Sequence, residues 1–146
     1  MKTHELKLDI KYFDDVKAGE KNFEISKNDR DFQVGDILEL KAYVKGLKSL
    51  AKWGEIIDPF NNFRMSHNYM TCAEEEADTI KVKVTDIILP KAWWSILNKF
   101  GINNGPVMTK SGFMFSPKEV LTVLEGYFST DRLPDDYVIL GIEVVE

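Results

Sequence analysis

The sequence predicts an α+β fold in a single domain. In some segments apolar and polar residues alternate, as in half-buried strands, and in others apolar residues recur at helical spacing. Both kinds of segment occur in each half of the chain. The 146 residues, of which 44% are hydrophobic and 12% aromatic, are enough for one ordinary core and too few for two large domains.

The first part of the chain predicts three strands and one short helix. Residues alternate from His4 to Ile10, and the spacing of apolar residues then becomes helical until Gly19, which is placed as a C-terminal stop. Gly35 supplies a turn conformation that other residues resist. The predicted elements are a strand over 4–10, a helix from 10 to 19, a strand over 22–27 and a strand over 37–44.

The second part predicts two further strands and two helices. Pro90 ends a strand, Gly101 stops a helix, and Ser116 with Pro117 fits the N-cap and first position of another helix. The predicted elements are a strand over 80–89, a helix over 92–100, a helix over 117–127 and a strand over 136–145. Residues 45–78 lack clear periodicity and are interpreted as an insertion.

Charge and composition exclude several classes of protein. The net charge of -5 disfavours a protein that coats duplex DNA, since such proteins gain affinity by neutralising many phosphates. Residues 1–52 carry a net charge of +1 and residues 53–146 carry -6, so an anionic ligand is expected at the N-terminal part. The apolar runs are too short to span a bilayer. With Cys72 as the single cysteine and no leader pattern, we expect a cytoplasmic protein without a disulfide.

Several short motifs carry a resemblance to a known superfamily. They are His-Glu-Leu-Lys at 4–7, Phe-Glu-Ile at 23–25, Lys-Asn-Asp-Arg-Asp-Phe at 27–32, Val-Gly-Asp-Ile-Leu at 34–38 and Tyr-Val-Ile-Leu-Gly at 137–141. This pattern resembles the ASCH/PUA-like superfamily, and in particular a bacterial and phage family known as domain of unknown function 3850.

The resemblance implies a mixed β pseudo-barrel of five or six strands with two to four flanking helices. Residues 45–78 and 90–133 have no counterpart in the motifs and are expected to be long insertions in a single domain covering 1–146. The superfamily includes RNA-binding modules and readers of modified bases. The resemblance therefore implies a cleft, near residues 21–30, that binds single-stranded RNA or a nucleotide.

Two other functions remain open. A relative of the superfamily is an amidohydrolase of a modified nucleoside, and its lysine matches Lys21, whereas its threonine nucleophile is replaced by Glu24. An enzyme of this kind would use Lys21 to orient the carbonyl and Glu24 as a base towards water. In the third interpretation, the two insertions form the protein-binding surface of a phage or mobile-element accessory protein.

The polar cluster after the first helix holds most of the candidate site residues. Lys21 and Arg30 are expected to contact a phosphate or a base carbonyl, Asn28 to read a base edge, and Glu24 to accept from an exocyclic amine. Lys27 adds a further positive charge beside them. The alternative is a charged loop whose side chains only brace the turn before Gly35.

Aromatic residues offer a second set of candidates, because an exposed ring can stack on an unpaired base. Trp93 falls on the apolar face of its helix and is expected in the core, whereas Trp94, one position further round, is a candidate for a surface role. The other aromatic candidates for stacking are Trp53, Phe60, Phe63 and Tyr69.

No metal or cofactor is predicted. His4, His67, Cys72 and Glu74–Glu76 lack the spacing of a metal site, and no phosphate-binding or dinucleotide-binding loop motif is found.

Overall fold

A computed structural model describes residues 1–44, 48–57, 65–101 and 105–145, with side chains not described at 54–57 and 65–70. Its helices and strands are, in order, β1 (Thr3–Asp9), α1 (Ile10–Lys17), β2 (Phe23–Lys27), β3 (Ile37–Val44), β4 (Ser49–Ile57), β5 (Met65–Thr71), the 3-10 helix η2 (Glu74–Glu76), β6 (Thr79–Ile88), α2 (Pro90–Phe100), β7 (Val107–Met108), β8 (Met114–Phe115), α3 (Pro117–Phe128) and β9 (Tyr137–Val144).

The chain divides into two compact units. The first unit comprises residues 1–2, 22–37 and 83–143, and the second unit comprises residues 3–21, 38–82 and 144–146. Strand β6 contributes its C-terminal part to the first unit and its N-terminal part to the second.

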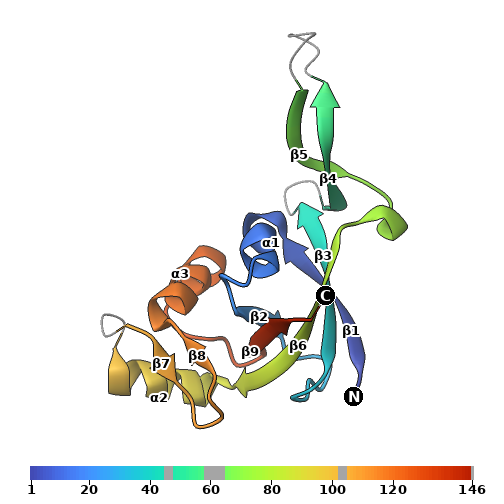
Figure 1. Ribbon diagram of the computed structural model, residues 1–146. Coiled ribbons are helices and arrows are strands. Elements are labelled where there is room, and N and C mark those ends of the chain that lie inside the picture. Colours follow the sequence, from blue (N-terminus) through green and yellow to red (C-terminus); the bar gives the residue numbers. More distant parts are fainter. Residues whose placement is uncertain (45–47, 58–64, 102–104, 146) are drawn as a thin grey trace. The chain divides into compact units, whose positions relative to one another are not determined.

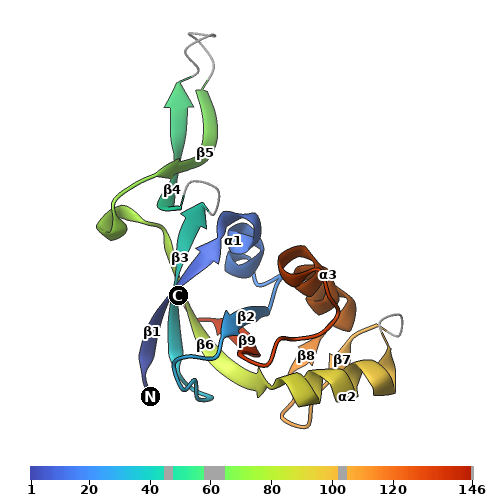
Figure 2. The ribbon, with the colours of Figure 1, turned by 180° about the vertical axis from the view of Figure 1, so that it is seen from behind.

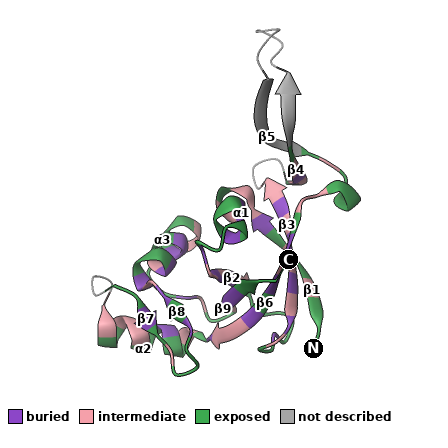
Figure 3. Ribbon diagram, in the orientation of Figure 1, coloured by how far each residue is buried: buried purple, intermediate pink, exposed green. Residues whose placement is uncertain are grey.

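The first unit contains the strands β2, β9 and β6 in that order, with the helices α2 and α3. Strand β2 pairs antiparallel with β9, placing Ile25 opposite Ile139. Helix α2 lies beside the β7–β8 hairpin in both Figure 1 and Figure 2. Buried residues lie on β6, β9 and α3, as Figure 3 shows, and they include Val84, Leu124 and Leu140. These apolar side chains form the core on which the candidate site is built.

The second unit contains strands in the order β6, β3, β4 and β5, with β1 paired to β3. Strands β1 and β3 run in the same direction (Figure 1), while β3 and β4 are antiparallel. Asp9 caps α1 by accepting a hydrogen bond from the backbone N–H of Lys11 at 3.0 Å. After the helix, Gly19 adopts a positive φ of 77°, which a residue with a side chain disfavours.

The predicted α+β class is confirmed, with a mixed sheet and flanking helices. The five predicted strands and three predicted helices are found within one or two residues of their expected ends. Ser116 does occupy the N-cap of α3, although its side chain makes no capping hydrogen bond.

Three features depart from the expectations. The segment 45–78 is not without regular structure, since it contains β4 and β5, which pair antiparallel. These two strands raise the sheet among the described residues to seven strands, rather than five or six. The β7–β8 hairpin within 90–133 was not predicted either, because strands of two residues carry no detectable alternation.

No helix in the described part of the chain has the length and apolar character needed to cross a membrane.

Candidate functional site

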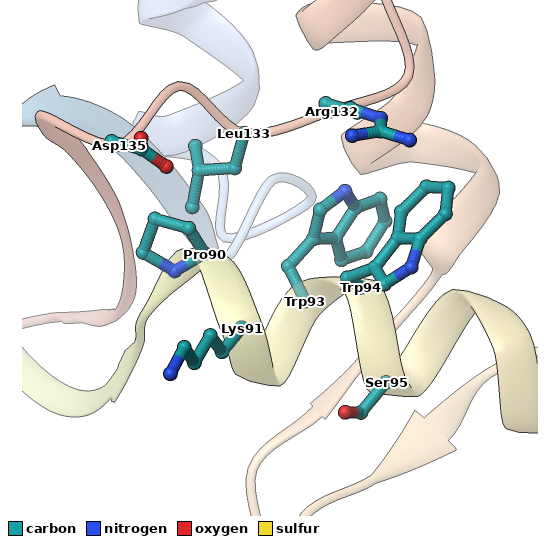
Figure 4. Close-up of a pocket in the computed structure, with 8 residues that line it drawn as sticks. All are labelled: Pro90, Lys91, Trp93, Trp94, Ser95, Arg132, Leu133 and Asp135. Carbon is teal, nitrogen blue, oxygen red and sulfur yellow. The ribbon is translucent and has the colours of Figure 1, made fainter.

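A pocket of about 360 Å³ opens in the first unit, between α2 and the loop that follows α3 (Figure 4). The residues that line it are Pro90, Lys91, Trp93, Trp94, Ser95, Arg132, Leu133 and Asp135. Its size lies in the range of small-molecule sites.

Helix α2 places two consecutive tryptophans in different environments. Pro90 begins the helix, where its missing N–H costs nothing. Consecutive helical residues are about 100° apart around the axis, so Trp93 is fully buried while Trp94 retains 39% of its surface. The prediction of Trp93 as a core residue is confirmed, and Trp94 has the exposure that its predicted surface role requires.

The loop after α3 is fixed by hydrogen bonds at several points. Ser129 ends the helix in the left-handed conformation, with its N–H bonded to the carbonyl of Glu125 at 3.0 Å. The indole Nε1–H of Trp93 donates to the carbonyl oxygen of Asp131 at 3.0 Å, and Leu133 is buried. The N–H of Arg132 donates to the Thr130 hydroxyl at 3.2 Å. This loop is therefore held in place by contacts within the protein.

Arg132 lies over the indole of Trp94, with its Cζ 4.5 Å from the ring centroid. At this distance the guanidinium is attracted to the face of the ring. The guanidinium covers one face of the indole, and the pair offers the remaining exposed surface of Trp94 next to a cation with several N–H donors. Such an arrangement can stack on a planar ring and hold an anionic group next to it.

The charged side chains of the pocket lie at different positions along its wall. Asp135 and Arg132 occupy opposite ends, with Leu133 between them (Figure 4). Lys91, in the first turn of α2, adds a second positive charge. The pocket thus holds two cations and one carboxylate, in contrast to the net charge of -5 of the whole chain.

Of the predicted site residues, Trp94 lines this pocket, whereas Lys27, Asn28 and Arg30 lie exposed at the end of β2 and in the loop that follows it. The backbone N–H of Asn28 donates to the carbonyl of Asp136 at 2.7 Å. Asp136 directly follows the pocket residue Asp135, so this hydrogen bond joins the predicted loop to the rim of the pocket.

The alternative interpretation of that loop also has structural support. Arg30 Nε lies 3.7 Å from the carboxylate of Asp29, and the amide of Gln33 donates to Asp31 at 3.1 Å. Asp31 takes a positive φ of 48°. These contacts brace the turn, and they leave the role of Arg30 in phosphate binding a prediction.

Lys21 and Glu24 belong to different units and are described separately. Lys21 is buried, with 7% of its surface exposed, and its Nζ lies 4.8 Å from the ring centroid of Tyr12. Glu24 lies in β2 opposite Leu140 of β9, and its Oε2 is buried. Their proposed catalytic roles stay predictions, as does the protein-binding interpretation of the insertions.

The second unit has a smaller pocket of about 190 Å³, lined by Asp14, Lys17, Trp53 and Asp78. Trp53 is 49% exposed, and its backbone N–H donates to the Asp78 carboxylate at 2.7 Å. Among the other aromatic candidates, Phe60 and Phe63 lie outside the described residues, and so does the side chain of Tyr69.

Beside this pocket, two groups have shifted pKa values. A side-chain hydrogen bond and the charge of Glu76 raise the pKa of Lys52, whose Nζ lies 2.5 Å from Oε2 of Glu76. Burial, followed by the charge of Glu76, raises the pKa of the Cys72 thiol. A raised pKa makes Cys72 a poor nucleophile at neutral pH.

The pocket residues Lys91, Arg132 and Asp135 were missed from the sequence. Each is a single charged residue that belongs to no recognisable sequence motif. The 129–135 loop comes to lie beside α2 only when the chain folds. The adjacent tryptophans at 93–94 were the one available signal. Within the described residues, no group of three His, Cys, Asp or Glu side chains is placed to hold a metal ion.

Residues 3–53 match the family described as Domain of unknown function (DUF3850). The match confirms the resemblance of the N-terminal motifs to that family. An uncharacterized 12.9 kDa protein encoded in the GpA 3′ region of Escherichia phage P2 is 48% identical over 46 residues. That alignment covers 32% of this chain and 42% of the phage protein.

A solved structure of low similarity also aligns with this chain. The crystal structure of hypothetical protein PH0355 is 22% identical in sequence, with a TM-score of 0.46, over 99% of this chain and 100% of that one.

Proposed function

We propose that the protein binds single-stranded RNA or a nucleotide, with one base held in the pocket formed by Trp94, Arg132 and Asp135. The observation that carries this proposal is the pairing of an exposed indole with a guanidinium 4.5 Å above it, inside a concave site. The resemblance to the ASCH/PUA-like superfamily, which includes RNA-binding modules, supports the same function.

The chemistry of the pocket matches the parts of a nucleotide. The ring face of Trp94 stacks on a base, and the cations Arg132 and Lys91 attract a phosphate. The pocket lies in the part of the chain, residues 53–146, that carries a net charge of -6, so anionic RNA is repelled from much of the surface around it. Binding is therefore expected to depend on this one locally positive region rather than on a broad basic face.

Fluorescence anisotropy with a short labelled single-stranded RNA tests the proposal. Base stacking contributes about 1–3 kcal/mol, so Trp94→Ala is expected to weaken binding by roughly 5- to 150-fold. Arg132→Ala is expected to weaken binding as well and to reduce its dependence on salt.

Trp53→Ala is the matched control, because Trp53 is also an exposed tryptophan but lies in the second unit. The control is expected to bind RNA as the wild type does. If Trp94→Ala and Arg132→Ala bind as tightly as the wild type, or if only Trp53→Ala loses affinity, the pocket does not bind RNA.

A further inference from the structure

We propose that Asp135 makes this pocket selective for guanine over the other bases. The inference rests on the proposed function, since it assigns the base that the pocket holds. The inference is based on the position of the Asp135 carboxylate, which lies on the pocket wall at the end opposite Arg132 (Figure 4).

A carboxylate distinguishes bases because, when ionised, it accepts hydrogen bonds and donates none. Guanine presents two neighbouring donors on its Watson–Crick edge, N1–H and the 2-amino group, and both can bond to one carboxylate. Adenine and cytosine each present one amino group beside a ring nitrogen that only accepts. Uracil presents one N–H between two carbonyl oxygens. For these three bases, an acceptor faces the carboxylate and repels it.

The carboxylate of Asp135 is available for this role. Within the described ranges of the chain, no hydrogen bond or ion pair engages it, while its backbone is held by the fixed loop that contains Leu133. Asp135 is exposed in the unliganded chain, and a base bound against it covers its carboxylate from water. A base without matching donors then leaves the covered carboxylate without a hydrogen bond, and this is the source of the discrimination.

The pocket also has an apolar part between its two charged ends. Pro90 and Leu133 form apolar wall between the two charged ends (Figure 4). A base that stacks on Trp94 with its donor edge towards Asp135 therefore turns its sugar and phosphate away from Asp135, to the side where Arg132 lies. Guanine binding thus uses the carboxylate and the cation together.

Isothermal titration calorimetry of the whole protein with GMP, IMP, AMP, CMP and UMP tests the inference. We expect GMP to bind at least tenfold more tightly than AMP, CMP or UMP. IMP keeps N1–H but lacks the 2-amino group, so its affinity is expected to fall between those of GMP and AMP. A uridine oligomer with one central guanosine, compared with an all-uridine oligomer, shows whether the same preference holds within RNA.

Asp135→Asn keeps the shape of the side chain, removes the charge and presents an amide donor. We expect it to lower GMP affinity at least tenfold and to remove the preference over AMP. Asp136→Asn is the matched control, because it makes the same change at the next exposed residue, which does not line the pocket. It is expected to keep both the affinity and the preference.

The outcomes separate the inference from the proposed function. If all bases bind equally well and Trp94→Ala weakens all of them, the pocket binds nucleotides and guanine selectivity is wrong. A guanine preference that survives in Asp135→Asn also overturns the role of Asp135. If the wild type binds neither nucleotide nor RNA, the proposed function is wrong and the inference falls with it.

Discussion

Gly141 is expected to be the least replaceable glycine of the first unit. It lies in β9, opposite Phe23 of β2, and is buried. A Cβ added at this position would lie 2.9 Å from Oγ1 of Thr85 and 3.0 Å from Cε1 of Phe113. Phe113 has little room to retreat, because its ring is stacked on that of Phe115 at a centroid distance of 5.2 Å.

The expected effect of Gly141→Ala is the difference between two terms. Overpacking of a well-filled core costs about 1–3 kcal/mol. Replacing glycine by alanine returns about 0.4–1 kcal/mol, because the unfolded chain loses conformational freedom. We therefore expect the free energy of unfolding to fall by about 1–2 kcal/mol.

Urea unfolding followed by tryptophan fluorescence measures this change, since the buried Trp93 lies in the same unit. With a slope of about 2 kcal/mol per molar urea, the midpoint is expected to fall by roughly 0.5–1 M. Gly126→Ala is the matched control. Gly126 lies in α3 with no atom within 4 Å of an added Cβ, so alanine is expected to stabilise the protein by about 0.5–1 kcal/mol.

The reasoning fails if Gly141→Ala has the same midpoint as the wild type or a higher one. Equal effects of Gly141→Ala and Gly126→Ala would also refute it, because close contact at Gly141 is the structural difference on which the prediction depends.

Two further predictions concern the buried carboxylate of Asp36 and the partly buried thiol of Cys72. Asp36→Ala is expected to lower the free energy of unfolding by about 2–4 kcal/mol in urea titrations, because its carboxylate accepts from the backbone N–H groups of Lys2 at 3.1 Å and Gln33 at 3.0 Å; an unchanged midpoint would contradict this role. Cys72 is expected to react with iodoacetamide more slowly at mildly alkaline pH than it does in the urea-unfolded chain, and Glu76→Gln should speed the reaction, because burial and the Glu76 charge raise the pKa of the thiol. The raised pKa of Cys72 stabilises the folded protein at pH values below the pKa of the unfolded thiol, about 8.5, and this stabilisation is lost as the pH rises through the pKa of the folded thiol. Equal alkylation rates in the folded and unfolded chains would refute the shift.

The elements that the sequence predicted are those in which burial follows the period of the backbone. In β1, Leu8 is buried while Glu5 and Lys7 are exposed, as alternation requires. The three helices likewise have an apolar face, and Pro117 marks the predicted first residue of α3. Pro90, which was expected to end a strand, is instead the first residue of α2, two residues before the predicted start. Periodicity is a local property, so a single sequence is enough to detect it.

The remaining features depend on contacts between distant residues. The β4–β5 hairpin was not predicted because Gly54 and a mixed composition interrupt the alternation of apolar and polar residues in its strands. Arg132 and Asp135 belong to the pocket only because their loop folds back onto α2. The hydrogen bond between Trp93 and Asp131 shows this, since it joins residues that are 38 positions apart in the sequence. The sequence could indicate Trp94 as exposed, but it could not indicate which charges would lie beside it.

The two tryptophans of α2 link the core to the candidate site. Trp93 packs in the core, yet its indole N–H holds the carbonyl of Asp131, the residue directly before Arg132. The guanidinium of Arg132 in turn lies on the exposed ring of Trp94. A change at Trp93 is therefore expected to weaken the proposed binding as well as stability, because it releases the loop that positions Arg132. Preorganised loops of this kind reduce the entropy lost on binding, which favours the proposed binding of an anionic ligand by a small pocket on an acidic protein.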